Sequence, residues 1–149
     1  MASSCGVPQE HIARRSRLRL NGASATTGVP SVLELEGEFD LDSVPEIDRF
    51  LRRHLGPLYH RDHLVIDLAG ATFVDSSFIA FLVRLVTDLR SRHKELVLVR
   101  PTGQVRKVLG LVGLPNLVPV FDSLDEALAA LCSGRLPVIP PAFSTAARA

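Results

Sequence analysis

The run HLVIDLAG, residues 63–70, is the feature that most constrains the fold. It is almost wholly apolar and is bounded by polar residues and Gly70, which predicts a strand buried on both faces. From Phe78 onward, apolar residues recur at helical spacing and predict an amphipathic helix that covers the sheet. The same alternation of strand and helix continues in ELVLVRP, GQVRKVLGLVG, LVPVF and DSLDEALAAL. We therefore expect right-handed crossovers and a partly parallel sheet.

The first part of the chain predicts an antiparallel pair followed by a helix. RLRLNG has the alternation of an edge strand, and a loose turn joins it to the strand SVLELEGEFD. Ser43 and Glu46 have capping-box spacing, Pro45 suits a first helical turn, and Pro57 closes the helical pattern. The same capping-box spacing recurs at Ser123 and Glu126.

Length and hydropathy predict one domain that does not span a membrane. The 149 residues are 46% hydrophobic, but no apolar run approaches the roughly 18 to 20 residues of a spanning helix, and Arg84 interrupts the most apolar helix. The N-terminus has no apolar signal-peptide core, so we expect a cytoplasmic protein. We expect flexible tails over residues 1–16 and the Pro/Ala-rich residues 134–149, with the domain over 17–133.

Charge and cysteine content exclude several classes of function. With 17 basic and 16 acidic residues the net charge is only +1, so no field attracts nucleic acid or a membrane surface. The basic run between Arg14 and Arg19 indicates a solvated arm. Cys5 and Cys132 have no CxxC spacing and are expected to be reduced, unpaired thiols.

Signals for an enzyme, a metal or a cofactor are weak. No GxSxG surrounds Ser77, and the sequence has no GxxxxGK[ST] phosphate-binding loop. His60 and His63 form a lone HxxH, which predicts surface histidines rather than a zinc site. The spacing of Asp40 and Asp42 suggests paired carboxylates, but Asp42 or Ser43 is readily explained as a helix cap. We expect a binding module with no cofactor and no metal.

The stretch TFVDSSFIAFLVRL, residues 72–85, is the strongest candidate for a functional site. It makes the turn from a buried strand into a helix, and such carboxyl-end turns of parallel strands gather exposed functional groups. Asp75 or Ser76 could simply cap the helix, or the serines could form a regulatory phosphorylation site.

Three motifs in order carry a family resemblance: LEGEFDLDSVPEI, LVIDLAGATFVDSSFIAFLVRL and VRKVLGLVGLPNLVPVFDSLDEAL. From about Leu18 to Leu131 the chain resembles the STAS domain family, specifically bacterial anti-sigma factor antagonists. The resemblance implies an α/β domain with a mixed sheet of about four to five strands and about four helices packed mainly on one face.

The resemblance also implies a partner switch in transcription regulation. In that family the second serine of DSS is phosphorylated by an anti-sigma factor that is also a serine kinase, and a protein serine phosphatase removes the phosphate. The unphosphorylated antagonist captures the anti-sigma factor and frees a sigma factor, here expected in a stress response.

Carried over residue by residue, the phosphoacceptor is Ser77, with Ser76 as second choice. Asp75 and Ser76 shape the turn, and Asp40 matches a loop beside the acceptor. Phe78 departs from the family, which commonly has Gly there, and could obstruct a kinase, anchor a partner or turn inward. These five residues form the expected partner-binding surface.

Two alternatives stay open. The chain could be a STAS scaffold subunit of a signalling assembly, in which Ser77 tunes assembly. It could also be a STAS accessory protein of a lipid or anion transport system that docks on a membrane partner and is never phosphorylated.

Overall fold

The elements of the fold alternate between strand and helix over most of the chain. A computed structural model describes residues 9–21, 30–56, 62–134 and 136. The strands in this part are β1 (Gln9–Ile12), β2 (Ser16–Asn21), β3 (Ser31–Phe39), β4 (Leu64–Val74), β5 (Leu96–Val99) and β6 (Val120–Phe121). The helices are α1 (Ser43–Leu55), α2 (Ser76–Arg90), α3 (Gly103–Leu111), the short 3-10 helix η3 (Leu114–Asn116) and α4 (Leu124–Ser133).

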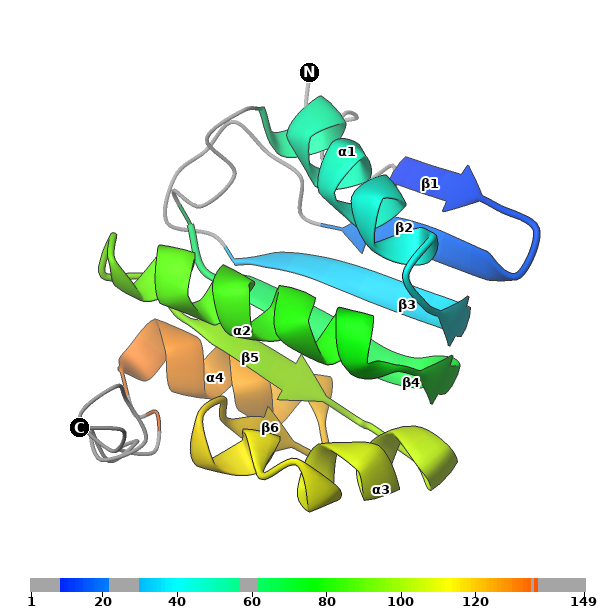
Figure 1. The fold of residues 1–149 in the computed structure, drawn as a ribbon. Coiled ribbons are helices and arrows are strands. Elements are labelled where there is room, and N and C mark those ends of the chain that lie inside the picture. The colour runs from blue at the N-terminus through cyan, green and yellow to red at the C-terminus, as the bar shows by residue number, and fades with distance from the viewer. Residues whose placement is uncertain (1–8, 22–29, 57–61, 135, 137–149) are drawn as a thin grey trace.

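The sheet is mixed, with its strands in sequence order from β1 to β6. The β1/β2 and β2/β3 pairs are antiparallel, and the β3/β4, β4/β5 and β5/β6 pairs are parallel. The parallel part arises because a helix separates each of these strands from the next and returns the chain to the same end of the sheet. The predicted mixed α/β fold is confirmed (Figure 1).

One strand lies where the sequence predicted a flexible tail. β1 falls within residues 1–16 and pairs with β2, so that Gln9 faces Leu20 and Ile12 faces Arg17. The described part of the sheet thus has six strands rather than four to five, and β2 is an inner strand rather than an edge. The prediction missed β1 because QEHI alternates half-buried and exposed residues and has no apolar run.

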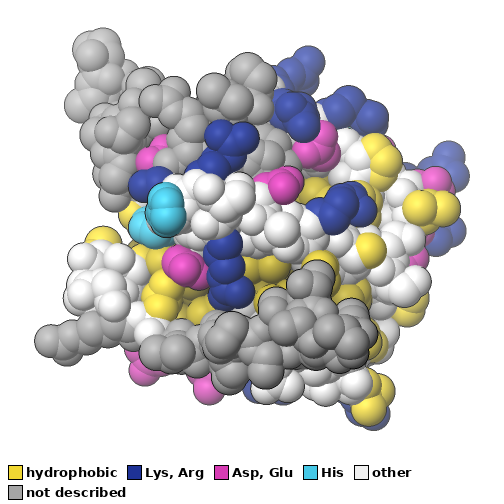
Figure 2. Space-filling model, turned by 60° about the vertical axis from the view of Figure 1, so that its left-hand side comes forward, with side chains coloured by type: hydrophobic (Ala, Val, Ile, Leu, Met, Phe, Trp, Pro, Cys, Tyr) yellow, Lys and Arg dark blue, Asp and Glu magenta, His cyan; other side chains and the backbone are white. Residues whose placement is uncertain are grey.

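The basic run is not a free arm, because it spans the β1–β2 turn, which holds Arg14 and Arg15, and the start of β2. Arg17 and Arg19 lie in β2. The Arg17 guanidinium lies 3.6 Å from the Glu10 carboxylate and 3.4 Å from that of Glu36, because the strands on either side supply acidic partners. On the face shown in Figure 2, Lys and Arg side chains are likewise interspersed with Asp and Glu.

The helices cover the two faces of the sheet unequally. In Figure 1, α1 and α2 lie in front of the sheet and α4 lies behind it. The larger core cluster joins the strands to α1, α2 and α3 and includes Leu33, Ile47, Ile66, Leu82, Leu98 and Leu109. The smaller one lies under α4 and comprises Val32, Val65, Val97, Val99, Ala127 and Leu131. Most helical cover is on one face, as predicted, and the first half of β4 is buried on both.

No helix in the described ranges is long and apolar enough to cross a bilayer.

Candidate functional site

The candidate site lies where β3 and β4 end side by side. These strands are parallel, with Phe39 opposite Val74, and the Asp75 amide donates a hydrogen bond to the Phe39 carbonyl over 3.3 Å. Asp40 and Asp75 directly follow these paired residues. The two aspartates, 35 positions apart, therefore leave the sheet at the same edge.

Asp75 is the N-cap of α2. Its backbone is extended, with φ −118° and ψ −173°, and its Oδ1 accepts hydrogen bonds from the amides of Ser77 over 2.9 Å and Phe78 over 3.1 Å. These bonds satisfy two of the amide groups that a helix leaves unpaired at its start. The expectation that Asp75 or Ser76 caps this helix is confirmed for Asp75.

The two serines occupy the first turn of α2. Ser76 is exposed and Ser77 is half-buried. Within the described residues, neither hydroxyl makes a hydrogen bond, so both oxygens are chemically uncommitted. The positive end of the helix dipole lies at this turn and favours negative charge placed there.

Asp40, rather than Ser43, organises the start of α1. Its Oδ1 accepts from the amides of Asp42 and Ser43 over 3.1 and 3.2 Å, and from the Ser43 hydroxyl over 3.2 Å. The predicted capping box at Ser43 is therefore wrong, since the Ser43 hydroxyl donates to Asp40 instead of accepting from the helix. Glu46, the glutamate of this predicted capping box, lies 3.8 Å from the His11 imidazole.

Phe78 is a core residue and not part of the surface. Its side chain is 0% exposed, and its ring centroid lies 5.8 Å from that of Phe39 and 6.4 Å from that of Phe81. A direct contact of Phe78 with a partner, as predicted, is excluded by this burial. Of the three possibilities raised by the sequence, the ring has turned inward.

Two exposed apolar side chains at this edge escaped the sequence analysis. Leu41, in the turn after Asp40, is 69% exposed, and Phe73, near the end of β4, is 42% exposed. The exposure of Leu41 could have been inferred from its position between two aspartates in a turn. Nothing in the alternation of β4 marked the second, because the register shifts against β3 near Gly37 change which residues face outward.

Histidines and acidic residues do not assemble a metal site in the described part of the chain, where no group of three potential ligands occurs. His63 instead joins two strands, since its Nδ1 accepts a hydrogen bond from the Glu95 amide over 3.0 Å. His60 lies outside the described residues. Cys132 is an exposed free thiol, and Cys5 also lies outside the described residues.

The chain is similar to a known domain family and to several solved structures. A family model described as "Mlab, STAS domain" matches residues 14–119. An anti-sigma factor antagonist from Mycobacterium paratuberculosis has a TM-score of 0.63 at 23% identity, over 78% of this chain and 93% of that one. The Bacillus cell fate determinant SpoIIAA in its phosphorylated form has a TM-score of 0.53 at 18% identity, over 84% and 99% of the two chains. The murine anion transporter Slc26a9 has a TM-score of 0.60 at 17% identity, over 74% of this chain and 18% of that one.

Proposed function

The chain belongs to the STAS domain family, and from this premise we propose that it is an anti-sigma factor antagonist of the bacterial cytoplasm. In this proposal it is a binding module without catalytic activity, which captures an anti-sigma factor and so releases a sigma factor. The observation that carries the proposal is the first turn of α2. There, two serines with uncommitted hydroxyls follow an N-cap aspartate, beside the end of β3. The anti-sigma factor antagonist among the structural neighbours supports it.

Ser77 is the proposed phosphoacceptor. A phosphate adds about −1.5 to −2 charges. On Ser77 it would lie in the first turn of α2, where the helix dipole favours an anion and Asp75 already accepts from the Ser77 and Phe78 amides. The Bacillus cell fate determinant SpoIIAA among the structural neighbours exists in a phosphorylated form, which supports a modification of this kind.

Phosphorylation would abolish binding by changing the charge of the binding surface, without unfolding the domain. The unmodified edge presents the Ser77 hydroxyl beside Asp75, with Leu41 exposed nearby. A partner that packs on this surface must remove water from it. Desolvating a new dianion without cationic partners costs several kcal/mol, so the complex would dissociate while the domain stays folded. The partner is then a serine kinase as well as an anti-sigma factor, and a serine phosphatase resets the switch.

Four tagged forms in the native cells test this function: wild type, Ser77→Ala, Ser77→Asp and the matched control Ser76→Ala. Capture in the presence of ATP should retain an anti-sigma factor on Ser77→Ala and release it from Ser77→Asp, while Ser76→Ala behaves as wild type. Phosphopeptides from the wild type should carry phosphate on Ser77 alone. Equal capture by the Ala and Asp forms would rule out the switch.

An accessory role in a transport system is the second candidate. It is favoured by the anion transporter among the structural neighbours. This role predicts that the tagged chain co-purifies with a membrane transporter and that Ser77 stays unmodified in growing and stressed cells alike. The same capture experiment therefore separates the two functions.

A further inference from the structure

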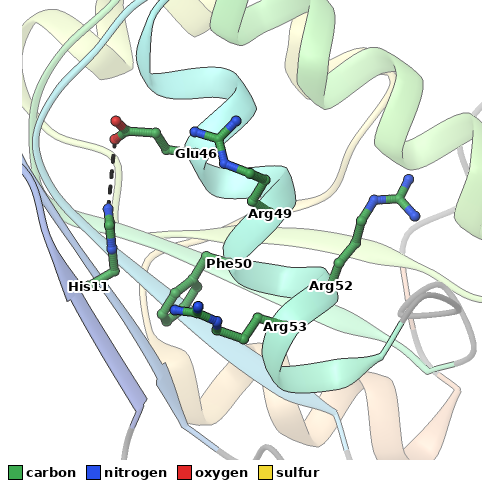
Figure 3. Close-up of a pocket in the computed structure, with 6 residues that line it drawn as sticks. All are labelled: His11, Glu46, Arg49, Phe50, Arg52 and Arg53. Atoms are coloured by element: carbon green, nitrogen blue, oxygen red, sulfur yellow. Dashed lines mark ion pairs between the residues drawn. The ribbon is translucent and has the colours of Figure 1, made fainter.

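A hollow between β1 and one face of α1 contains no residue of the serine turn among its described lining residues. It is lined by His11 from β1 and by Glu46, Arg49, Phe50, Arg52 and Arg53 from α1. Figure 3 shows His11 opposite the helix, with Glu46, Arg49, Phe50 and Arg53 along the facing side of α1. These four helix positions are spaced i, i+3, i+4 and i+7, so they share one face.

Two of the three arginines offer uncommitted charge to this hollow. In the described residues neither Arg49 nor Arg53 has a carboxylate oxygen within 4.0 Å. Arg52 differs, because its Nε lies 2.8 Å from the Asp48 carboxylate and its side chain is directed to the other side of the helix (Figure 3). Arg49 and Arg53 are one turn apart, roughly 6 Å along the axis.

The helix dipole does not account for this pair. Basic residues favour the last turn of a helix, and Arg53 lies there together with Arg52 and His54. Arg49 lies a turn earlier, where that interaction has faded. Both are also arginine rather than lysine, and the planar guanidinium binds carboxylate and phosphate oxygens through paired hydrogen bonds.

The floor and far wall of the hollow are fixed in place. Phe50 is 5% exposed, and its ring lies 6.2 Å from that of His11 and 4.6 Å from that of His54. Among the described lining residues Glu46 is the one carboxylate, and it lies 3.8 Å from the His11 Nε2, against the two positive charges of Arg49 and Arg53. The charge that remains available in the hollow is positive.

We propose that this hollow binds a phosphate-type oxyanion, held between the guanidinium groups of Arg49 and Arg53. The site is independent of the proposed partner switch, since Ser77 contributes nothing to it. Glu46 lies at one end of the hollow. Its negative charge repels the anion and therefore lowers the affinity.

Titration of the full chain with inorganic phosphate, followed by ¹H–¹⁵N NMR at constant ionic strength against chloride, tests the site. We expect saturable shifts confined to His11, Glu46, Arg49, Phe50 and Arg53. Arg49→Gln and Arg53→Gln should each weaken binding about tenfold, the effect of losing one charge-assisted hydrogen bond. Arg92→Gln, an exposed site outside the hollow, should leave the affinity unchanged.

A second pair of variants separates a site from nonspecific attraction. Glu46→Gln and Asp125→Asn each remove one negative charge, the first in the hollow and the second on exposed α4. Glu46→Gln should tighten phosphate binding several-fold and Asp125→Asn should not. Equal effects of the two, shifts spread over the surface, or no saturation would overturn the proposal. Well-dispersed spectra of every variant show that the fold is intact.

Discussion

The Phe78 ring lies directly after the two serines of the α2 turn, packed between Phe39 and Phe81. We expect Phe78→Ala to lower the free energy of unfolding by ~3–5 kcal/mol, the cost of emptying a fully buried aromatic site. Val83→Ala, on the same helix at 39% exposure, is the control and should cost about 0.5 kcal/mol. Urea denaturation measures both. A Phe78 loss as small as the control's would show that the ring does not hold the turn to the core.

His63 should make stability depend on pH. Burial is the main cause that lowers its pKa from 6.5, with nearby Lys94 adding to it against Glu95 and Asp62. The neutral ring accepts the Glu95 amide hydrogen bond, which a protonated Nδ1 cannot do. The unfolded chain therefore takes up the proton first, so this stability is complete above pH 6.5 and declines as the pH falls below it.

Urea denaturation of wild type and His63→Asn across this range checks the effect. The asparagine retains an acceptor near the Nδ1 position but does not titrate, so the decline with falling pH should become shallower. Part of the slope should remain, because burial and Arg53 also lower the pKa of His54. Identical slopes for the two proteins would contradict the role of His63.

At the scale of single elements, the same sequence signal led to two outcomes. Ser43 and Ser123 both stand three residues before a glutamate, and only Ser123 accepts the amide of that glutamate, over 3.3 Å. The difference is Asp40, whose carboxylate reaches the α1 start from the preceding strand end. The local spacing of a serine and a glutamate does not show whether another acceptor, such as the Asp40 carboxylate, lies close to the helix start. The position of that acceptor depends on how the chain leaves the sheet.

Replacing a glycine by alanine should have opposite effects on stability at Gly37 and at Gly110. Gly37 in β3 has φ +101°, and a Cβ there would lie 2.1 Å from the Arg15 carbonyl oxygen, which belongs to the β1–β2 connection. Gly37→Ala should therefore cost ~2 kcal/mol or more. Gly110 lies in α3 with nothing within 4 Å of its Cβ position, so Gly110→Ala should gain ~0.5–1 kcal/mol. Thermal unfolding of the pair tests this; a stabilised Gly37→Ala would mean that the β2–β3 register is wrong.

Across the whole molecule, the alternation of strand and helix was enough to predict the parallel half of the sheet. The proximity of Asp40 to the serine turn came instead from the family resemblance, and it agrees with the parallel pairing of β3 and β4, whose ends lie side by side. The apolar spacing that begins at Phe78 already placed this ring on the buried face of its helix, whereas the exposure of Leu41 was not predicted. The extent of that exposure depends on how α1 and α2 seat on the sheet, which a one-dimensional pattern does not contain. The sequence thus predicted which chain segments meet at this edge better than which side chains they expose there.

The proposed switch requires that charge on Ser77 leave the whole domain stable, and a matched pair of aspartates tests this. Ser77 lies in the first turn of α2, whereas Ser133 is the last residue of α4. A negative charge interacts favourably with the first position and unfavourably with the second, by ~0.3–1 kcal/mol in each case. Ser133→Asp also removes the hydroxyl that donates to the Ala129 carbonyl over 2.7 Å.

Urea denaturation at low salt measures the free energy of unfolding of both variants. The value for Ser77→Asp should match or exceed that of wild type, and the value for Ser133→Asp should fall below it. The difference between the two variants should be smaller at high salt. If Ser77→Asp were the less stable of the two, repulsion by Asp75 would outweigh the helix dipole, and phosphorylation would act by loosening the domain instead of by changing its surface.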